Sequence, residues 1–130
     1  MKRSTYLIIT AIIGILSGIG MLLSPVATLQ MSGITGLNDY GTLLARDVGI
    51  FLFVIGVMNA VVRNAPDSKA MTGILVANLL SHLLPFFLDG YNTIIGTLSP
   101  QNWFVVIEHG ILTLGFAYYL RKATQNKVYE

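Results

Sequence analysis

Residues 6–23 read YLIITAIIGILSGIGMLL, eighteen consecutive residues without one charged side chain. As a helix rising about 1.5 Å per residue, this stretch covers roughly 27 Å, close to the thickness of a hydrocarbon core. Backbone groups cannot stay unpaired in lipid, so the stretch predicts a membrane-spanning α-helix. It is longer than the usual signal-peptide core, and no small-x-small cleavage site follows it. We therefore expect the helix to be retained.

Three further apolar stretches of similar length follow, at residues 43–62, 70–88 and 103–120. Clusters of turn-forming residues separate them, at 64–68 and again at 99–102. We predict an all-α fold: a polytopic membrane protein in which residues 1–130 form a single bundle of four transmembrane helices.

The composition excludes several classes of protein. Hydrophobic residues make up 54% of the chain and charged residues 11%, whereas soluble domains carry about 25% charged residues. A small soluble domain needs polar residues to cover its large surface, and a disordered chain needs charge, so both classes are excluded. The net charge of +2 is too small for nucleic-acid binding. The absence of cysteine excludes disulfides and thiolate chemistry.

The basic residues predict the orientation of the chain. Seven of the eight lie before the first span, between the second and third, or after the fourth, and only Arg46 lies elsewhere. The positive-inside rule then places both termini and the 63–69 loop in the cytoplasm. We expect a multi-pass protein of the cell's inner (plasma) membrane. The seven residues are Lys2, Arg3, Arg63, Lys69, Arg121, Lys122 and Lys127.

Small residues predict how the helices pack. Helices in lipid associate where small side chains let their backbones approach. The first span carries Gly14, Gly18 and Gly20, and the second carries the stripe Ala45, Gly49 and Gly56, with Gly110 and Gly115 on the fourth. We favour packing within one chain over a homodimer through the first helix.

Polar side chains gather in the outer half of three spans. Counting inward at about 1.5 Å per residue, the ionisable groups of the second, third and fourth spans share one depth band. Charged groups in a bilayer are costly and usually face the bundle interior, where they pair or mark a site. The candidate ligand-binding residues are Arg46, Asp47, Asn78, His82, Asp89, Glu108 and His109.

Helical spacing refines this cluster. Asn78, His82 and Asp89 are separated by four and seven residues, which places them on one face of the third span. His109 and Thr113 share a stripe of the fourth span, beside the stripe that carries Glu108. Two interpretations remain open: a ligand or ion site, or a self-satisfied network in which Arg46 bridges to Glu108 or Asp89.

Metal and haem chemistry find little support in these spacings. His82 and His109 with Glu108 or Asp47 would suit zinc or iron. However, Glu108 and His109 are adjacent and point about 100° apart along a helix, and no Glu-x-x-His or His-Glu-x-x-His motif occurs. A haem held between the two histidines is geometrically possible. We assign no metal ligands and leave the cofactor open.

The chain also lacks Gly-x-Ser-x-Gly, a phosphate-binding loop and a dinucleotide fingerprint, so we assign no catalytic residues and favour a non-enzymatic role. The leading hypothesis is a polar pocket near the outer leaflet that binds a lipophilic ligand, such as a quinone or lipid, or serves a larger membrane complex. The alternative is an ion- or proton-coupled transporter or channel formed by oligomerisation, with Glu108 or Asp47 as the carboxyl group. A haem- or metal-dependent redox enzyme or isomerase is the third hypothesis.

Four short patterns together resemble small four-helix bacterial membrane proteins of a loosely DoxX-like kind. This resemblance covers most of the chain and implies a quinone-related or accessory role beside a membrane redox complex. His82, Glu108 and His109 are not part of it. The patterns are Leu23-Ser24-Pro25, Ala45-Arg46-Asp47-Val48-Gly49, Asn64-Ala65-Pro66-Asp67-Ser68 and Gly115-Phe116-Ala117-Tyr118-Tyr119.

Overall fold

The computed structural model describes residues 1–126 and is helical throughout, with no strand in that range. Lys127, one of the seven basic residues that predict the orientation of the chain, lies outside the described residues. Four long helices are joined by loops, and a short helix and a 3-10 turn lie within two of the connections. They are α1 (Arg3–Leu23), α2 (Pro25–Met31), α3 (Asp39–Val62), α4 (Lys69–Ile94), η1 (Pro100–Asn102) and α5 (Trp103–Asn126).

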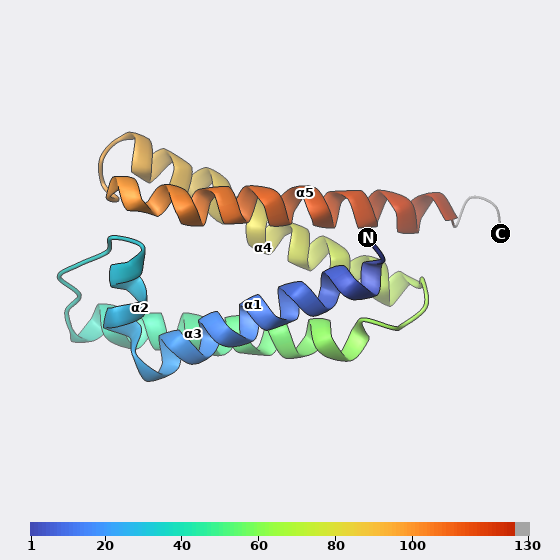
Figure 1. Ribbon diagram of the computed structural model, residues 1–130, viewed down its shortest axis with the longest axis horizontal. Helices are drawn as coiled ribbons and strands as arrows, with labels where there is room; N and C mark the ends of the chain where they lie inside the picture. The colour runs from blue at the N-terminus through green and yellow to red at the C-terminus, as the bar shows by residue number, and fades with distance from the viewer. Residues whose placement is uncertain (127–130) are drawn as a thin grey trace.

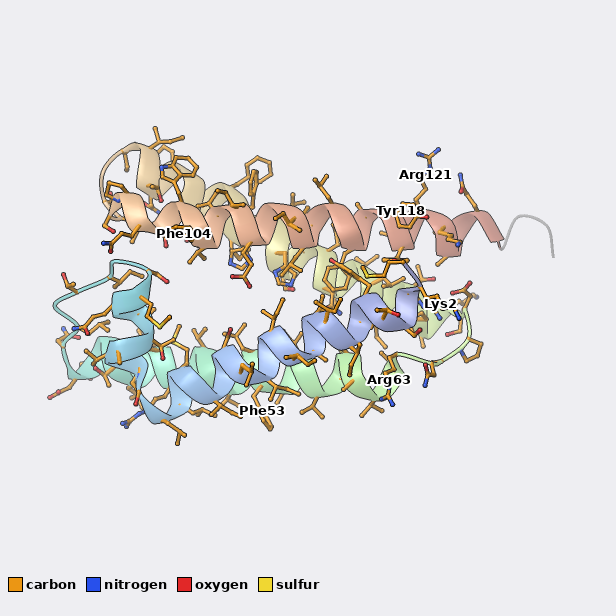
Figure 2. The ribbon with its side chains drawn as sticks, viewed as in Figure 1. Lys2, Phe53, Arg63, Phe104, Tyr118 and Arg121 are labelled. Atoms are coloured by element: carbon orange, nitrogen blue, oxygen red, sulfur yellow. The ribbon has the colours of Figure 1, made fainter. Side chains whose placement is uncertain are left out.

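The four long helices are long and apolar enough to cross a membrane, as the sequence predicted. Only 17–28% of the residues in each apolar window are buried within the chain, so most of each helix surface is free for lipid. Phe53 on α3 and Phe104 on α5 are among these exposed apolar side chains (Figure 2). This exposure of apolar side chains agrees with a multi-pass membrane protein.

The helices form two antiparallel hairpins (Figure 1). Hairpin one consists of α1 and α3, and hairpin two of α4 and α5. The hairpins meet at the end that carries the start of α1, the last turns of α5 and the 63–68 loop, which we call the terminal end. The loops 24–38 and 95–102 lie at the other end, the loop end. Helix α4 crosses obliquely, beside α3 at its start and beside α5 further on.

All four spans run past the predicted boundaries. The largest difference is at α4, where the predicted span ends at residue 88, before the turn-forming pair Asp89-Gly90, but the helix continues to Ile94. Gly90 is buried in this helix, and a side chain there would reach Val106 of α5 at 3.7 Å. The hydroxyl of Thr93 donates to the backbone carbonyl of Asp89 at 2.6 Å. Packing against α5 therefore carries the helix past a dipeptide that usually ends one.

The core that joins the hairpins lies toward the terminal end. Tyr6 of α1 inserts against α5, where its hydroxyl donates to the Leu112 carbonyl at 2.7 Å and its ring meets Phe116 edge-on at 4.9 Å. A side chain at Gly115 would overlap the Tyr6 ring, so the glycine makes room for it. The buried core side chains are Tyr6, Leu7, Met71, Leu75, Leu112, Phe116, Tyr119 and Ala123.

Candidate functional site

Two histidines from neighbouring helices meet inside hairpin two. The Nδ1 atoms of His82 on α4 and His109 on α5 lie 3.0 Å apart, at hydrogen-bonding distance. The two ring centroids are 5.2 Å apart, and the His82 ring stacks on Phe116 at 5.6 Å with an interplanar angle of 9°. Both histidines are partly buried. The pair links α4 and α5 inside hairpin two.

The hydrogen bond between the rings dictates their chemistry. One imidazole donates from Nδ1–H and the other accepts at a bare Nδ1. In the neutral pair, the donating ring therefore has a bare Nε2, whereas the accepting ring carries a proton on Nε2. Among residues 1–126, no hydrogen bond is found to either Nε2 atom. The pair offers one acceptor and one donor to a third group.

Carboxylates and an unpaired hydroxyl surround the histidine pair. Asp89 and Glu108 are both close enough to His109 to interact with it electrostatically. Thr113 lies one turn from His109 along α5, and its hydroxyl oxygen is buried without a hydrogen-bond partner in the described part of the chain. A buried hydroxyl without a partner costs free energy. We call these five residues, His82, His109, Asp89, Glu108 and Thr113, the histidine cluster.

Pro85 leaves a backbone carbonyl without its helical hydrogen bond in the same region. Pro85 lies inside α4 and has no backbone N–H to donate to the Ser81 carbonyl four residues earlier. Ser81 immediately precedes His82. The backbone beside His82 therefore has an acceptor that the helix itself does not satisfy.

Asn78 belongs to a different polar group from His82, although the two share a face of α4. Its amide pairs reciprocally with that of Asn59 on α3, at 2.9 and 3.0 Å. Asn59 also donates to the Thr10 hydroxyl of α1 at 3.3 Å. Asn59 and Asn78 are 2% and 1% exposed, so this amide network is sealed from any ligand. It ties three helices together in lipid, where an unpaired amide would be costly.

Arg46 and Asp47 are not brought to the histidine cluster. Both are exposed on α3, because the neighbouring Ala45 and Gly49 turn the opposite face of the helix onto α1. Within residues 1–126, no ion pair or hydrogen bond links either one to Glu108 or Asp89. The bridging network through Arg46 is therefore not seen, and the ion pair found within residues 1–126 is Arg3–Asp67.

Four members of the histidine cluster were candidates from the sequence. The fifth, Thr113, was expected to share the stripe of His109 but was not a candidate. It missed Phe116, whose ring supports His82, because an aromatic residue at helical spacing is indistinguishable from ordinary core. It also missed the pairing of Asn59 with Asn78. Asn59 lies three residues before the end of α3, whereas Asn78 lies nine residues after the start of α4, so distance from the helix ends did not predict their contact.

Cofactor chemistry can be tested against this geometry. Across residues 1–126, no group of three or more His, Asp or Glu side chains is placed to hold a metal ion. A haem between His82 and His109 would require the two rings to separate, because their Nδ1 atoms are in direct contact. The residues do not fit a haem bound between them in this arrangement.

Comparison with known proteins adds no family: no protein-family profile, curated protein or solved structure matches this chain.

Proposed function

We propose that this protein binds the polar head of a lipophilic carbonyl compound, of the quinone class, at the histidine cluster. The observation that carries the proposal is the His82–His109 hydrogen bond, which leaves one Nε2 donor and one Nε2 acceptor without a partner. A quinone carbonyl accepts a hydrogen bond, and the hydroxyl of the reduced form donates one. The pair can serve either form by exchanging the tautomers of its two rings.

The surroundings of the pair support a ligand of this kind. The Thr113 hydroxyl provides a further group without a partner next to His109. Ligand sites of this type combine an apolar lining with a few placed polar groups, and the exposed apolar surface of hairpin two supplies the apolar part. In this proposal both termini are cytoplasmic, following the positive charges, and the cluster lies toward the outer leaflet. A DoxX-like, quinone-related role agrees with this function but remains a prediction.

Titration with decylubiquinone tests the proposal, with the fluorescence of Trp103 as the readout. Trp103 is the only tryptophan in the chain and lies six residues before His109 on α5. Quinones quench tryptophan fluorescence, so binding at the cluster gives saturable quenching. His82→Phe keeps a flat ring against Phe116 and removes both nitrogens. We expect the apparent Kd to rise about tenfold, as for the loss of one hydrogen bond.

A matched control on the same helix is Asn92→Ala, since Asn92 donates only to the Leu88 carbonyl near the loop end. Thr113→Val is a second test, because it removes a hydroxyl that has no partner and conserves volume. We expect this variant to bind decylubiquinone more weakly while unfolding at the same or a higher temperature. Non-saturable quenching, or equal quenching in wild type and His82→Phe, would overturn the proposal.

A proton path is the second candidate, and it rests on the same hydrogen bond. A proton arriving at one Nε2 can leave from the other Nε2 when the pair exchanges tautomers, with Asp89 and Glu108 beside it. A single chain of four helices has too few helices to enclose a complete proton path across the membrane, so this function requires an oligomer. Proton flux in liposomes that is abolished by His82→Phe, without quinone binding, would favour it.

A further inference from the structure

A second polar region lies at the terminal end of the bundle, away from the histidine cluster. It is a cavity of about 360 Å³ between the start of α1, the α3–α4 loop and the last turns of α5. This volume lies near the lower limit for small-ligand sites. It is large enough for a lipid headgroup but not for a large molecule. We call it the basic cavity. Its lining residues are Met1, Lys2, Arg3, Ser4, Arg63, Asn64, Asp67, Tyr119, Lys122 and Ala123.

The charge of the lining is strongly one-sided. Among the described residues, four cationic side chains and a single carboxylate, Asp67, line the cavity. Arg3 forms an ion pair with that carboxylate. Gathering so many cations around one anion is unfavourable, and a bound anion would relieve the repulsion.

The walls of the cavity are held in place by hydrogen bonds. Arg3 donates to Asp67 and to the Ala65 carbonyl, which ties the start of α1 to the α3–α4 loop. The Tyr119 hydroxyl donates to the Met1 carbonyl at 2.8 Å, which ties the same segment to α5. The cavity is therefore bounded on three sides before any ligand arrives.

Donor groups remain available in this cavity. The Nε atom of Arg3 is buried and makes no hydrogen bond to any residue in 1–126. Arg63 uses one nitrogen, Nη1, on the Ala60 carbonyl at 2.6 Å, and its guanidinium carries further N–H groups. Arginine matches the oxygens of a phosphate group with paired hydrogen bonds, and lysine binds the same group as a point charge.

The position of the cavity relates it to the membrane surface. Lys2 and Arg63 lie at the end of the bundle where the apolar spans finish, as Figure 2 shows. Basic pockets between helices at this level receive the headgroups of acidic phospholipids. We propose that the basic cavity binds an anionic phosphate group, carried by a phospholipid headgroup or free in solution.

Native mass spectrometry of the full chain in detergent tests this site, with phosphatidylglycerol, phosphatidylcholine and inorganic phosphate added separately. We expect a phosphatidylglycerol adduct that exceeds the phosphatidylcholine adduct. Lys122→Gln and Arg63→Gln should each lower its occupancy about fivefold, as expected for one basic residue at an acidic surface. Both side chains belong to exposed residues, so we expect the variants to fold.

The matched control is Arg121→Gln. Arg121 precedes Lys122 on α5 and carries the same charge, but it does not line the cavity and points away from Lys2 and Arg63 (Figure 2). Occupancy should be unchanged in this variant. A phosphate adduct with the same dependence on Lys122 and Arg63, but no lipid adduct, supports the site with a soluble ligand as its source.

Two results overturn the proposal: the absence of both adducts, and a loss of lipid in Arg121→Gln equal to that in Lys122→Gln. The second result would show diffuse attraction to surface charge. The site is independent of quinone binding, since none of the histidine cluster lines the cavity.

Discussion

The two hairpins of this protein pack in opposite ways. In hairpin one, α1 and α3 touch backbone to backbone through glycines. A side chain at Gly18 would lie 2.6 Å from the Phe53 nitrogen and 2.7 Å from the Gly49 carbonyl oxygen. Between α4 and α5 of hairpin two, the contacts at glycines are to side chains: Gly110 would meet Phe86 at 3.0 Å, and Gly90 would meet Val106 at 3.7 Å.

This difference explains where the polar groups of the two hairpins lie. Where α1 and α3 touch backbone to backbone at Gly18 and Gly49, no space is left between the helices, and Arg46 and Asp47 are exposed away from this contact. Helices held apart by side chains can enclose polar groups, and hairpin two holds His82, His109 and Thr113 between its helices. Glycine packing thus favours a rigid support, and side-chain packing favours a site.

The largest expected effect is in hairpin one. Gly18→Ala places a methyl group against the backbone of α3, which cannot move aside as a side chain can. We expect a loss of about 3 kcal/mol in the free energy of unfolding, the upper part of the range for overpacked cores. Unfolding of the purified protein in a denaturing-detergent titration measures this. A loss below 1 kcal/mol would contradict backbone-to-backbone packing.

The next effect concerns the amide network that joins the hairpins. Asn78→Leu leaves the buried Asn59 amide without its reciprocal partner, and we expect a loss of about 2 kcal/mol in the same titration. The double variant Asn59→Leu with Asn78→Leu removes both amides and should recover part of that loss. If the double variant loses the sum of the two single losses, the pairing is not what stabilises this contact.

A smaller effect is expected at the glycine of hairpin two. Gly110→Ala meets only the edge of the Phe86 ring, which can rotate away. The free energy of unfolding should fall by less than about 1 kcal/mol. A loss as large as that of Gly18→Ala would show that the two hairpins pack alike. It would contradict the difference between backbone packing in hairpin one and side-chain packing in hairpin two.

The smallest effect should have the opposite sign. Gly73 lies in the second turn of α4, and a side chain there would meet nothing within 4 Å. Gly73→Ala should raise the free energy of unfolding by about 0.5 kcal/mol, because alanine restricts the unfolded chain and favours the helix. The same titration measures it. Destabilisation by Gly73→Ala would show that contacts outside this chain occupy that face.

Much of the fold was predictable from particular residues. The four apolar stretches predicted the long helices, and the glycines predicted as packing residues, Gly14, Gly18, Gly49 and Gly56, lie where α1 and α3 meet. The sequence missed α2, although Pro25 after a serine is a common helix start. The side of the membrane that each loop faces remains a prediction.

The candidate site was predictable only in part. Depth counting brought Arg46 and Asp47 to the level of the histidines, and helical spacing placed Asn78 on the face of His82. Depth, however, says nothing about direction around a helix. The Ala45–Gly49 stripe indicates that Arg46 and Asp47 point away from the contact with α1. Nothing in the spacing indicated that Asn78 would turn to Asn59.

The sequence alone determined that the chain is a set of membrane-spanning helices, because that follows from length, hydropathy and the need to pair every backbone group in lipid. Only the tertiary structure decided which polar side chains meet. The rotation of each helix and the oblique path of α4 are set by contacts between residues far apart in the chain. Those contacts paired His82 with His109, enclosed Asn59 with Asn78, and gathered the cations of the basic cavity.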